Sequence, residues 1–265
     1  MKIVISTIIV ALSIGFLLGL LLGLFKKIFS VKVDPKIQAI RDALSGANCG
    51  GCGFAGCDSF AEAVVKGKAS SAGCVAGGAD CASAIAFIMG SSASGVTPKI
   101  AFLACNGTEE SALERGTYIG VKTCRASQLV AGGTKKCSFG CIGFGDCVEA
   151  CPFDAIHMGH HSLPIVDKEK CVGCGKCVKA CPKTLLVLIP KDSKGAIARC
   201  SCRSDNKAQI KKDCSAGCFK CGMCVRKCPK SAIQMLNGIP SIDRSKCDLC
   251  GECIKSCPDK VLSFL

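Results

Sequence analysis

The chain has 265 residues, 26 of them cysteine, and a formal net charge of +14. This charge is typical of nucleic-acid-binding proteins, but aromatic residues make up only 5% of the chain and are not interleaved with the basic runs. The sequence therefore lacks the stacking surface that such proteins use, and we expect no nucleic-acid partner. The cysteine content indicates either a disulfide framework or metal sites in a reducing compartment, and the cysteine spacing decides between them.

An uncharged segment near the N-terminus predicts a membrane anchor. Residues 3–25 contain no charged side chain, and 23 residues form a helix long enough to cross the hydrocarbon core of a bilayer. A signal peptide would have a shorter apolar region followed by a small-residue cleavage site, whereas Lys26 and Lys27 follow here. We therefore expect residues 1–28 to form a single transmembrane helix that is retained in the mature protein.

The basic residues around this helix predict its orientation. Lys2 precedes it, whereas Lys26, Lys27, Lys32 and Lys36 follow it. Because lysine and arginine are enriched in cytoplasmic segments next to membrane helices, the bulk of the chain should lie on the cytoplasmic side. The expected location is the inner (cytoplasmic) membrane of the cell, and this agrees with a reducing compartment.

Residues 29–90 are expected to form a small helical domain that binds one [4Fe–4S] cluster. Asp34 and Pro35 are typical of a helix start, and a further helix is expected from about Ser59 to Lys66, ended by Gly67. A glycine-rich loop carries cysteines in the spacing C-x2-C-x4-C-x16-C. The expected ligands are Cys49, Cys52, Cys57 and Cys74, with Cys81 as a competing fourth ligand.

After a connecting segment at 91–135, whose first residues are mostly small and polar, the chain contains an internal repeat. The stretch 171–182 reads CVGCGKCVKACP, the C-x2-C-x2-C-x3-C-P run by which bacterial ferredoxins hold [4Fe–4S] clusters. Disulfides need no such regular spacing, and zinc sites usually pair two C-x2-C motifs across a longer gap. The same run returns 76 residues later, and the run before it returns after 77. We expect two tandem two-cluster ferredoxin-like units at 136–190 and 191–265, with short strands such as AIHM and PIV between the runs.

In two-cluster ferredoxins the fourth cysteine of each run binds the other cluster, and this rule predicts the ligands of the second unit. One cluster is expected on Cys218, Cys221, Cys224 and Cys257, and the other on Cys247, Cys250, Cys253 and Cys228. Each unit alone is too small to bury a large core, so the clusters are expected to stabilise its fold.

The first unit departs from this pattern at Phe144, which occupies the position of Cys221 in the second unit. Cys137 lies four residues before Cys141 and is the expected substitute. One cluster is therefore expected on Cys137, Cys141, Cys147 and Cys181, and its neighbour on Cys171, Cys174, Cys177 and Cys151. Cys137 has an equivalent in the second unit, Cys214, where the thiol is surplus.

These assignments use 20 cysteines for about five [4Fe–4S] clusters per chain. The remaining thiols are Cys81, Cys105, Cys124, Cys200, Cys202 and Cys214. Two alternatives stay open for them: buried structural thiols, or a sixth cluster that would raise the iron content from about 20 to about 24 atoms. The expected fold class is α+β, with an N-terminal transmembrane helix, a small helical cluster domain and two ferredoxin-like units.

Together these features resemble the B subunit of the Rnf complexes, the membrane-bound, ion-translocating ferredoxin:NAD oxidoreductases. The loop NCGGCGFAGC with the following AEAV, and the run CSFGCIGFGDCVEACPF, carry the resemblance, which extends over essentially the whole chain. The second ferredoxin-like unit resembles the longer form of this protein found in anaerobic bacteria.

The resemblance implies an electron-transfer subunit of a translocase rather than a complete enzyme. It would accept electrons from reduced soluble ferredoxin and relay them to flavin- and Fe–S-bearing partner subunits that reduce NAD while Na⁺ or H⁺ is moved. No catalytic residues are expected on this chain. Lysines around the second unit are candidates for steering an acidic donor, namely Lys211, Lys212, Lys220 and Lys227.

Three other functions remain alternatives. A membrane-anchored polyferredoxin could serve an oxidoreductase that pumps no ions. A non-redox metal-binding scaffold would contain zinc and lack the visible absorption of Fe–S clusters. A catalytic Fe–S enzyme would need a cluster with an open iron site, whereas each expected cluster here has four cysteines. His157, His160 and His161 lie in a predicted hairpin and are interpreted as exposed turn residues.

Overall fold

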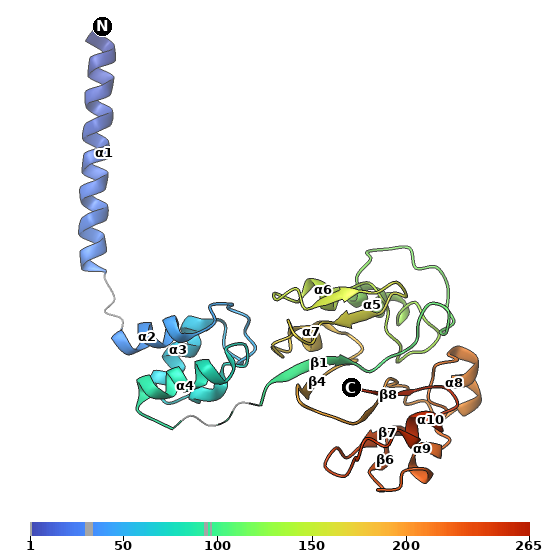
Figure 1. Ribbon diagram of the computed structural model, residues 1–265. Helices are drawn as coiled ribbons and strands as arrows, with labels where there is room; N and C mark the ends of the chain where they lie inside the picture. The colour runs from blue at the N-terminus through green and yellow to red at the C-terminus, as the bar shows by residue number, and fades with distance from the viewer. Residues whose placement is uncertain (1, 30–33, 93–94, 96) are drawn as a thin grey trace.

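The computed structural model describes residues 2–29, 34–92, 95 and 97–265 (Figure 1). Lys32, one of the lysines that predict the membrane orientation, lies outside these described residues. The first element is helix α1 (Lys2–Ile28), which extends away from the rest of the chain. Its segment Val4–Ile28 has a mean hydropathy of 2.8, and its length and composition are sufficient to cross a membrane.

A helical domain follows, with α2 (Pro35–Ala43), α3 (Cys57–Val65), the short 3₁₀ helix η1 (Ser71–Gly73) and α4 (Gly78–Met89). The side chain of Asp34 accepts a hydrogen bond from the Lys36 amide at 2.9 Å, and Pro35 takes the first helical position, as the sequence predicts. Helix α3 ends at Val65, and Gly67 adopts the left-handed conformation expected of a helix stop. Ile40, Phe60 and Ile85 form the buried centre of this domain.

The rest of the chain contains two copies of one arrangement. The first copy comprises β1 (Lys99–Leu103), α5 (Cys124–Ala131), α6 (Asp146–Glu149), β2 (Ile156–Met158), β3 (Pro164–Val166), α7 (Lys176–Ala180) and β4 (Leu186–Pro190). The second comprises β5 (Ala196–Ala198), α8 (Lys207–Asp213), α9 (Met223–Arg226), β6 (Ile233–Leu236), β7 (Ile239–Ile242), α10 (Glu252–Lys255) and β8 (Leu262–Phe264). The strands predicted between the cysteine runs are present in both copies.

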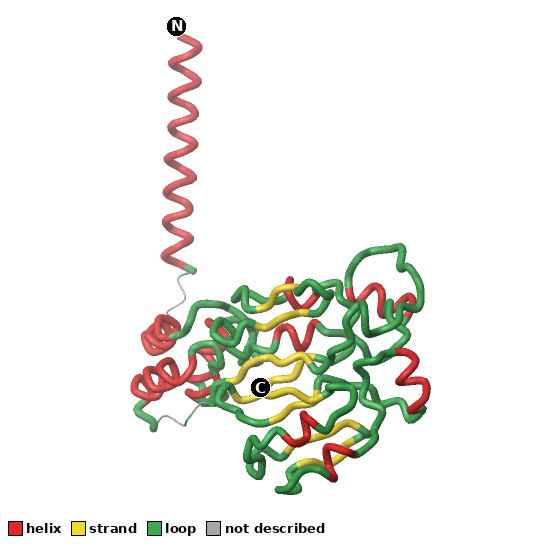
Figure 2. Tube along the Cα trace, turned by 45° about the vertical axis from the view of Figure 1, so that its right-hand side comes forward, coloured by secondary structure: helices red, strands yellow, loops and turns green. Residues whose placement is uncertain are grey.

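All strand pairs are antiparallel and two-stranded, and the pairing repeats between the copies. Strand β1 pairs with β4, so that Leu103 faces Leu186, and β5 pairs with β8, so that Ala198 faces Leu262. The hairpins β2–β3 and β6–β7 repeat in the same way. In Figure 2 the β1–β4 and β5–β8 pairs lie between the two hairpins, and a buried cluster containing Ile197 joins them.

The segment 91–135, expected from the sequence to connect the domains, contributes directly to the repeat. It contains β1, which forms a sheet with β4, and helix α5. Ala112 forms an isolated antiparallel bridge with Cys214 of the second copy, and the Leu113 amide donates to the Asp213 carbonyl at 2.8 Å. The segment therefore packs between the two copies, and it carries Cys105 and Cys124 into their cores.

Candidate iron–sulfur sites

All 26 cysteines lie within the described residues, and all are free thiols. Most of them gather in sets around small cavities. Within the part of the chain that the structure describes, no three His, Cys, Asp or Glu side chains converge closely enough to hold a single metal ion. Three sets of four thiols instead line cavities, and this wider arrangement suits a polynuclear group.

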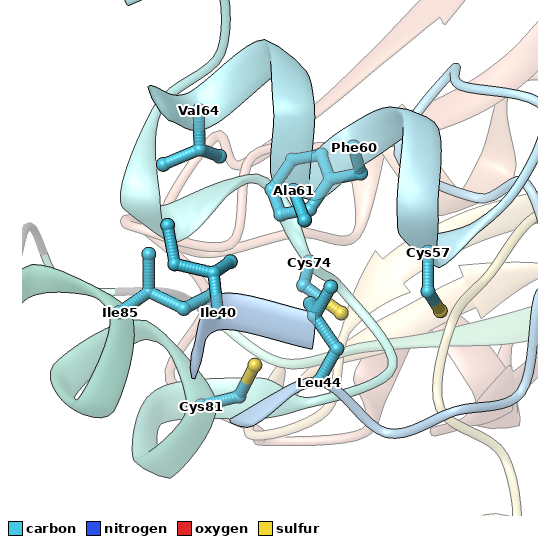
Figure 3. Packing of buried hydrophobic residues seen from close by; sticks show 9 residues of the cluster. All are labelled: Ile40, Leu44, Cys57, Phe60, Ala61, Val64, Cys74, Cys81 and Ile85. Atoms are coloured by element: carbon cyan, nitrogen blue, oxygen red, sulfur yellow. The ribbon is translucent and has the colours of Figure 1, made fainter. Parts of the chain in front are cut away.

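The first set belongs to the helical domain (Figure 3). A cavity between the loop and α3 is lined by Cys49, Cys52, Cys57 and Cys74, the four ligands expected from the sequence. Cys57 begins α3, and its amide donates a 2.8 Å hydrogen bond to Asn48 Oδ1. Cys74 follows η1, so one loop and two helical ends bring the four thiols together.

Cys81, the competing fourth ligand, lies behind this set rather than in it. It does not line the cavity, and in Figure 3 it projects from α4 below Cys74. Burial, reinforced by the neighbouring Cys74 thiol, raises the pKa of Cys81 to about 12. A Cβ at Gly77 would lie 2.6 Å from the sulfur of Cys81 and 3.2 Å from that of Cys74, so glycine is needed for the two thiols to approach.

The second set lies in the first ferredoxin-like unit and also matches the expected ligands. Cys151, Cys171, Cys174 and Cys177 line one cavity between α7 and the β2 strand. The Ala101 amide of β1 donates a 3.4 Å hydrogen bond to the Cys171 sulfur. Burial raises the pKa of Cys177 to about 11. Thiols that bind metal as thiolates would release their protons.

The third set differs from the sequence expectation. Its cavity is lined by Cys124, Cys141, Cys147 and Cys181, whereas Cys137 lies in a different cavity. Burial raises the pKa of both Cys141 and Cys147 to about 12, and the Cys124 thiol contributes to both shifts.

Helix α5 positions Cys124, which is its first residue. Thr123 caps the helix by accepting a hydrogen bond from the Ala126 amide at 3.1 Å. The Asp146 carboxylate accepts from the Cys124 amide at 2.6 Å and so ties α5 to the start of α6, next to Cys147. Phe144, at the position of the missing thiol, instead packs on Tyr118, with 5.8 Å between the ring centroids. No spacing rule could identify Cys124, because it lies outside the cysteine run in the expected connecting segment.

The second unit holds two further sets. Burial raises the pKa of Cys224, and the neighbouring thiols of Cys221 and Cys257 raise it further. The thiols of Cys224 and Cys257 also act on Cys218. Burial and the thiols of its neighbours likewise raise the pKa of Cys253 to about 11. These neighbouring thiols are those of the two groups expected from the runs, Cys218, Cys221, Cys224 and Cys257, and Cys228, Cys247, Cys250 and Cys253.

The four Cys-Pro turns share one backbone geometry. In each, the amide four residues after the cysteine donates to its sulfur at 3.3–3.4 Å. The acceptors are Cys151, Cys181, Cys228 and Cys257, and the donors are Ala155, Leu185, Ala232 and Val261. Such hydrogen bonds to sulfur are one determinant of the reduction potential of Fe–S clusters.

The first three sets adjoin one another along the chain. Gly51 of the helical domain packs so closely on the second set that a Cβ there would lie 2.8 Å from the Cys174 carbonyl oxygen. Cys181 of the third set and Cys151 of the second belong to neighbouring Cys-Pro runs that exchange their fourth thiols. Apart from Cys81, the thiols outside the five sets line a separate cavity of about 440 Å³ between the two units, and they are Cys105, Cys137, Cys200, Cys202 and Cys214.

Comparison with protein families agrees with this division. A family model described as a putative Fe-S cluster matches residues 44–76. A 4Fe-4S dicluster domain matches residues 140–186, and another 4Fe-4S dicluster model matches residues 170–232 and 217–261. The fold therefore contains 4Fe-4S dicluster ferredoxin domains in addition to the N-terminal apolar helix and mixed helices and strands.

Three curated relatives extend over most of the chain. The B subunit of the Na(+)-translocating ferredoxin:NAD(+) oxidoreductase complex of Acetobacterium woodii is 42% identical, over 83% of this chain and 66% of its own length. The proton-translocating counterpart of Clostridium ljungdahlii is 43% identical, over 93% of this chain and 87% of its own. The B subunit of the ion-translocating oxidoreductase complex of Methanosarcina acetivorans is 35% identical, over 93% and 92%. The chain therefore belongs to the family of Rnf complex B subunits, the electron-transfer Fe–S subunits of ion-translocating ferredoxin:NAD oxidoreductase complexes.

Proposed function

We propose that this chain takes electrons from reduced soluble ferredoxin and passes them, one at a time, to flavin- and Fe–S-bearing subunits that reduce NAD. The observation that supports the proposal is the succession of four-thiol sets, of which the first three adjoin one another. A [4Fe–4S] cluster held by four thiolates supplies one-electron transfer. Because each such cluster has all four protein ligands, the arrangement favours electron relay over chemistry at an open iron.

The residues present fit such clusters at five positions. The proposed ligands are Cys49, Cys52, Cys57 and Cys74; Cys151, Cys171, Cys174 and Cys177; Cys124, Cys141, Cys147 and Cys181; Cys218, Cys221, Cys224 and Cys257; and Cys228, Cys247, Cys250 and Cys253. In the third set, Cys124 replaces the Cys137 that the sequence alone favours.

The last set is the proposed entry point for electrons from ferredoxin. Cys250 is an exposed thiol, so a donor can approach this end of the second unit closely. Lys227 and Lys230 flank Cys228 of the same set, and both are exposed. Two of the lysines expected to steer the donor are engaged instead. Lys211 forms an ion pair with Asp259, and the side chain of Lys220, only 11% exposed, bonds to Asp205 at 3.1 Å.

Helix α1 is proposed to anchor the chain as a single membrane span, with the cluster-bearing part on the cytoplasmic side. Its described side chains from Val4 to Phe25 are exposed, and apart from Ser6 and Ser13 they are apolar. Lys26 and Lys27 at its C-terminal end supply the positive charge that marks the cytoplasmic boundary. Such an anchor would hold the relay next to the other subunits of the complex.

The test uses the full chain, purified in detergent without oxygen and mixed with reduced ferredoxin. We expect visible absorption typical of Fe–S clusters, and this absorption should decrease when reduced ferredoxin is mixed in. NADH should form only when the partner subunits are added. In membrane vesicles, deletion of the chain should abolish both ferredoxin-dependent NAD reduction and the ion uptake coupled to it. A colourless or zinc-containing chain would refute the relay. Loss of NAD reduction without any change in ion uptake would support the non-pumping polyferredoxin instead.

A further inference from the structure

The cavity between the two ferredoxin-like units is lined by thiols that none of the five sets uses. Cys105, Cys200 and Cys214 are each at most 8% exposed, and Cys137 and Cys202 complete the group. Five thiols around a cavity of about 440 Å³ are unusual for structural cysteines, which pack singly against apolar neighbours. The cavity therefore requires an explanation beyond packing.

Four of these thiols form two equivalent pairs that follow the internal repeat. Cys105 lies two residues after β1 and Cys200 two residues after β5. The amide before each makes the same strand contact, Ala104 to the Leu185 carbonyl and Arg199 to the Val261 carbonyl, both at 2.8 Å. Each sulfur then accepts a hydrogen bond of 3.4 Å from the first cysteine of its unit's first run.

Cys137 and Cys214 are equivalent in the same way. Each lies four residues before the first cysteine of its run. Each begins a tight turn in which a glycine amide, that of Gly140 or Gly217, donates back to the cysteine carbonyl at 3.0 or 3.1 Å. The repeat therefore contributes one thiol from a strand end and one from a turn in each unit, and all four line the same cavity.

The thiols cross the boundary between the units. A Cβ at Gly107 would lie 3.7 Å from the Cys105 sulfur and 3.5 Å from the Cys214 sulfur. A thiol of the first unit and a thiol of the second unit therefore both lie beside Gly107. Cys137 of the first unit packs into the buried cluster of Cys200 and Val261 in the second. Cys202 occupies the position equivalent to Gly107, so it has no partner in the repeat.

The buried ammonium group of Lys135 is independent evidence for negative charge beside the cavity between the two units. Lys135 is 4% exposed, and its Nζ donates to the Gly107 carbonyl at 2.6 Å. Among the described residues it has no carboxylate partner, although a buried ammonium normally requires an anion. Its charge acts on the thiols of both Cys141 and Cys214. Cluster thiolates on the two sides would supply the missing counter-charge.

We propose that Cys105, Cys137, Cys200 and Cys214 hold a sixth [4Fe–4S] cluster, two ligands from each ferredoxin-like unit. The inference rests on the proposed electron relay and deepens it. Cys105 contacts Cys141 of one unit and Cys200 contacts Cys218 of the other, so the sixth cluster lies between the two first-run sets. It connects the relay across the boundary between the units. In each transfer the donor cluster loses one electron and its neighbour gains that electron, and no proton moves.

The test is the metal content of the full chain, purified in detergent without oxygen, together with spin quantitation by EPR after full reduction. We expect about 24 iron and 24 acid-labile sulfide atoms per chain, and about 20 in Cys214→Ala and in Cys105→Ala. Retention of about 20 irons shows that these variants fold. Cys81→Ala, which removes a buried thiol outside any set, is the matched control and should keep about 24.

The outcomes separate the two proposals. A wild-type content near 20 iron atoms overturns the sixth cluster and leaves the relay intact, whereas zinc or no metal overturns the relay as well. Loss of four irons in Cys202→Ala but not in Cys200→Ala would overturn the ligand assignment. In Cys214→Ala, reduction by ferredoxin should become biphasic, with the clusters of one unit at least tenfold slower. A single phase at the wild-type rate would refute the connecting role.

Discussion

At the scale of single residues, the Cys-Pro turns depend on backbone conformations that L-residues adopt rarely. Asp154, Thr184, Ser231 and Lys260, each three residues after a Cys-Pro cysteine, have φ between 48° and 51°. A left-handed residue costs about 1–2 kcal/mol. The conformation turns the following amide back onto the cysteine sulfur, and the bound cluster is the favourable interaction that offsets this cost.

Cys124 and Cys137 are the two cysteines that the structure and the sequence assign to different sites. Because Cys124 lines the cavity of Cys141, Cys147 and Cys181, Cys124→Ala should lower the iron content by about four atoms and remove one EPR signal. If Cys137 were the fourth ligand, as the spacing predicts, the Cys124→Ala variant would keep every cluster.

Cys137→Ala is the informative comparison for this prediction. It should also remove about four irons, but from the cavity between the units, so the two variants should lose different EPR signals. The double variant should then lose about eight irons. Loss of only four in the double variant would mean that both thiols serve one cluster, and the assignment of Cys124 and Cys137 to separate sites would be wrong.

At the scale of elements, most helices of the ferredoxin-like units are too short to be stable alone. Helices α6, α9 and α10 have four residues each, and isolated helices below about 12–15 residues are marginal in water. Each of these helices carries a cysteine of a proposed cluster in its single turn, namely Cys147, Cys224 and Cys253. Metal ligation at the proposed clusters would therefore hold these elements in place, much as disulfides do in small secreted domains.

Helix α1 is different, because none of its described residues is buried against the cluster-bearing part. Its described side chains are exposed, and Figure 1 shows it extending away from the other domains. Removal of residues 1–28 should therefore release the chain from membranes into the soluble fraction while its iron content stays unchanged. Membrane fractionation with iron analysis of both fractions measures this. A truncated chain that still sediments with membranes, in the absence of the partner subunits, would contradict the anchor.

At the scale of the whole molecule, the clusters change the charge that a partner meets. The formal charge of +14 counts every thiol as neutral, whereas an oxidised [4Fe–4S] centre with four thiolates carries about −2. Six clusters would therefore leave the chain only weakly positive. Local arrangement then matters more than the total, and exposed lysines near the exposed Cys250 form the basic end of the relay.

Reduction by ferredoxin should depend on this basic end. The double variant Lys227→Glu/Lys230→Glu should be reduced several-fold more slowly at low ionic strength, and the difference from wild type should shrink as salt screens the charges. Lys68→Glu, an exposed substitution on the helical domain, is the matched control and should behave as wild type. Stopped-flow absorbance measures the rates. Rates that do not change with salt would rule out electrostatic steering.

The sequence by itself determined the cysteine runs, the repeat, the strands between the runs and the apolar N-terminal helix, because these features are local. The cysteine ligands of a ferredoxin cluster are mostly only a few residues apart in the sequence. Likewise, the start of helix α2 is determined by the adjacent residues Asp34 and Pro35. Only the tertiary structure brought Cys124 to the third set and placed Cys105, Cys137, Cys200 and Cys214 around one cavity. These thiols come from strand ends, turns and a helix start far apart in the chain. Their convergence is decided by how β1 pairs with β4, how β5 pairs with β8, and how the two units pack together.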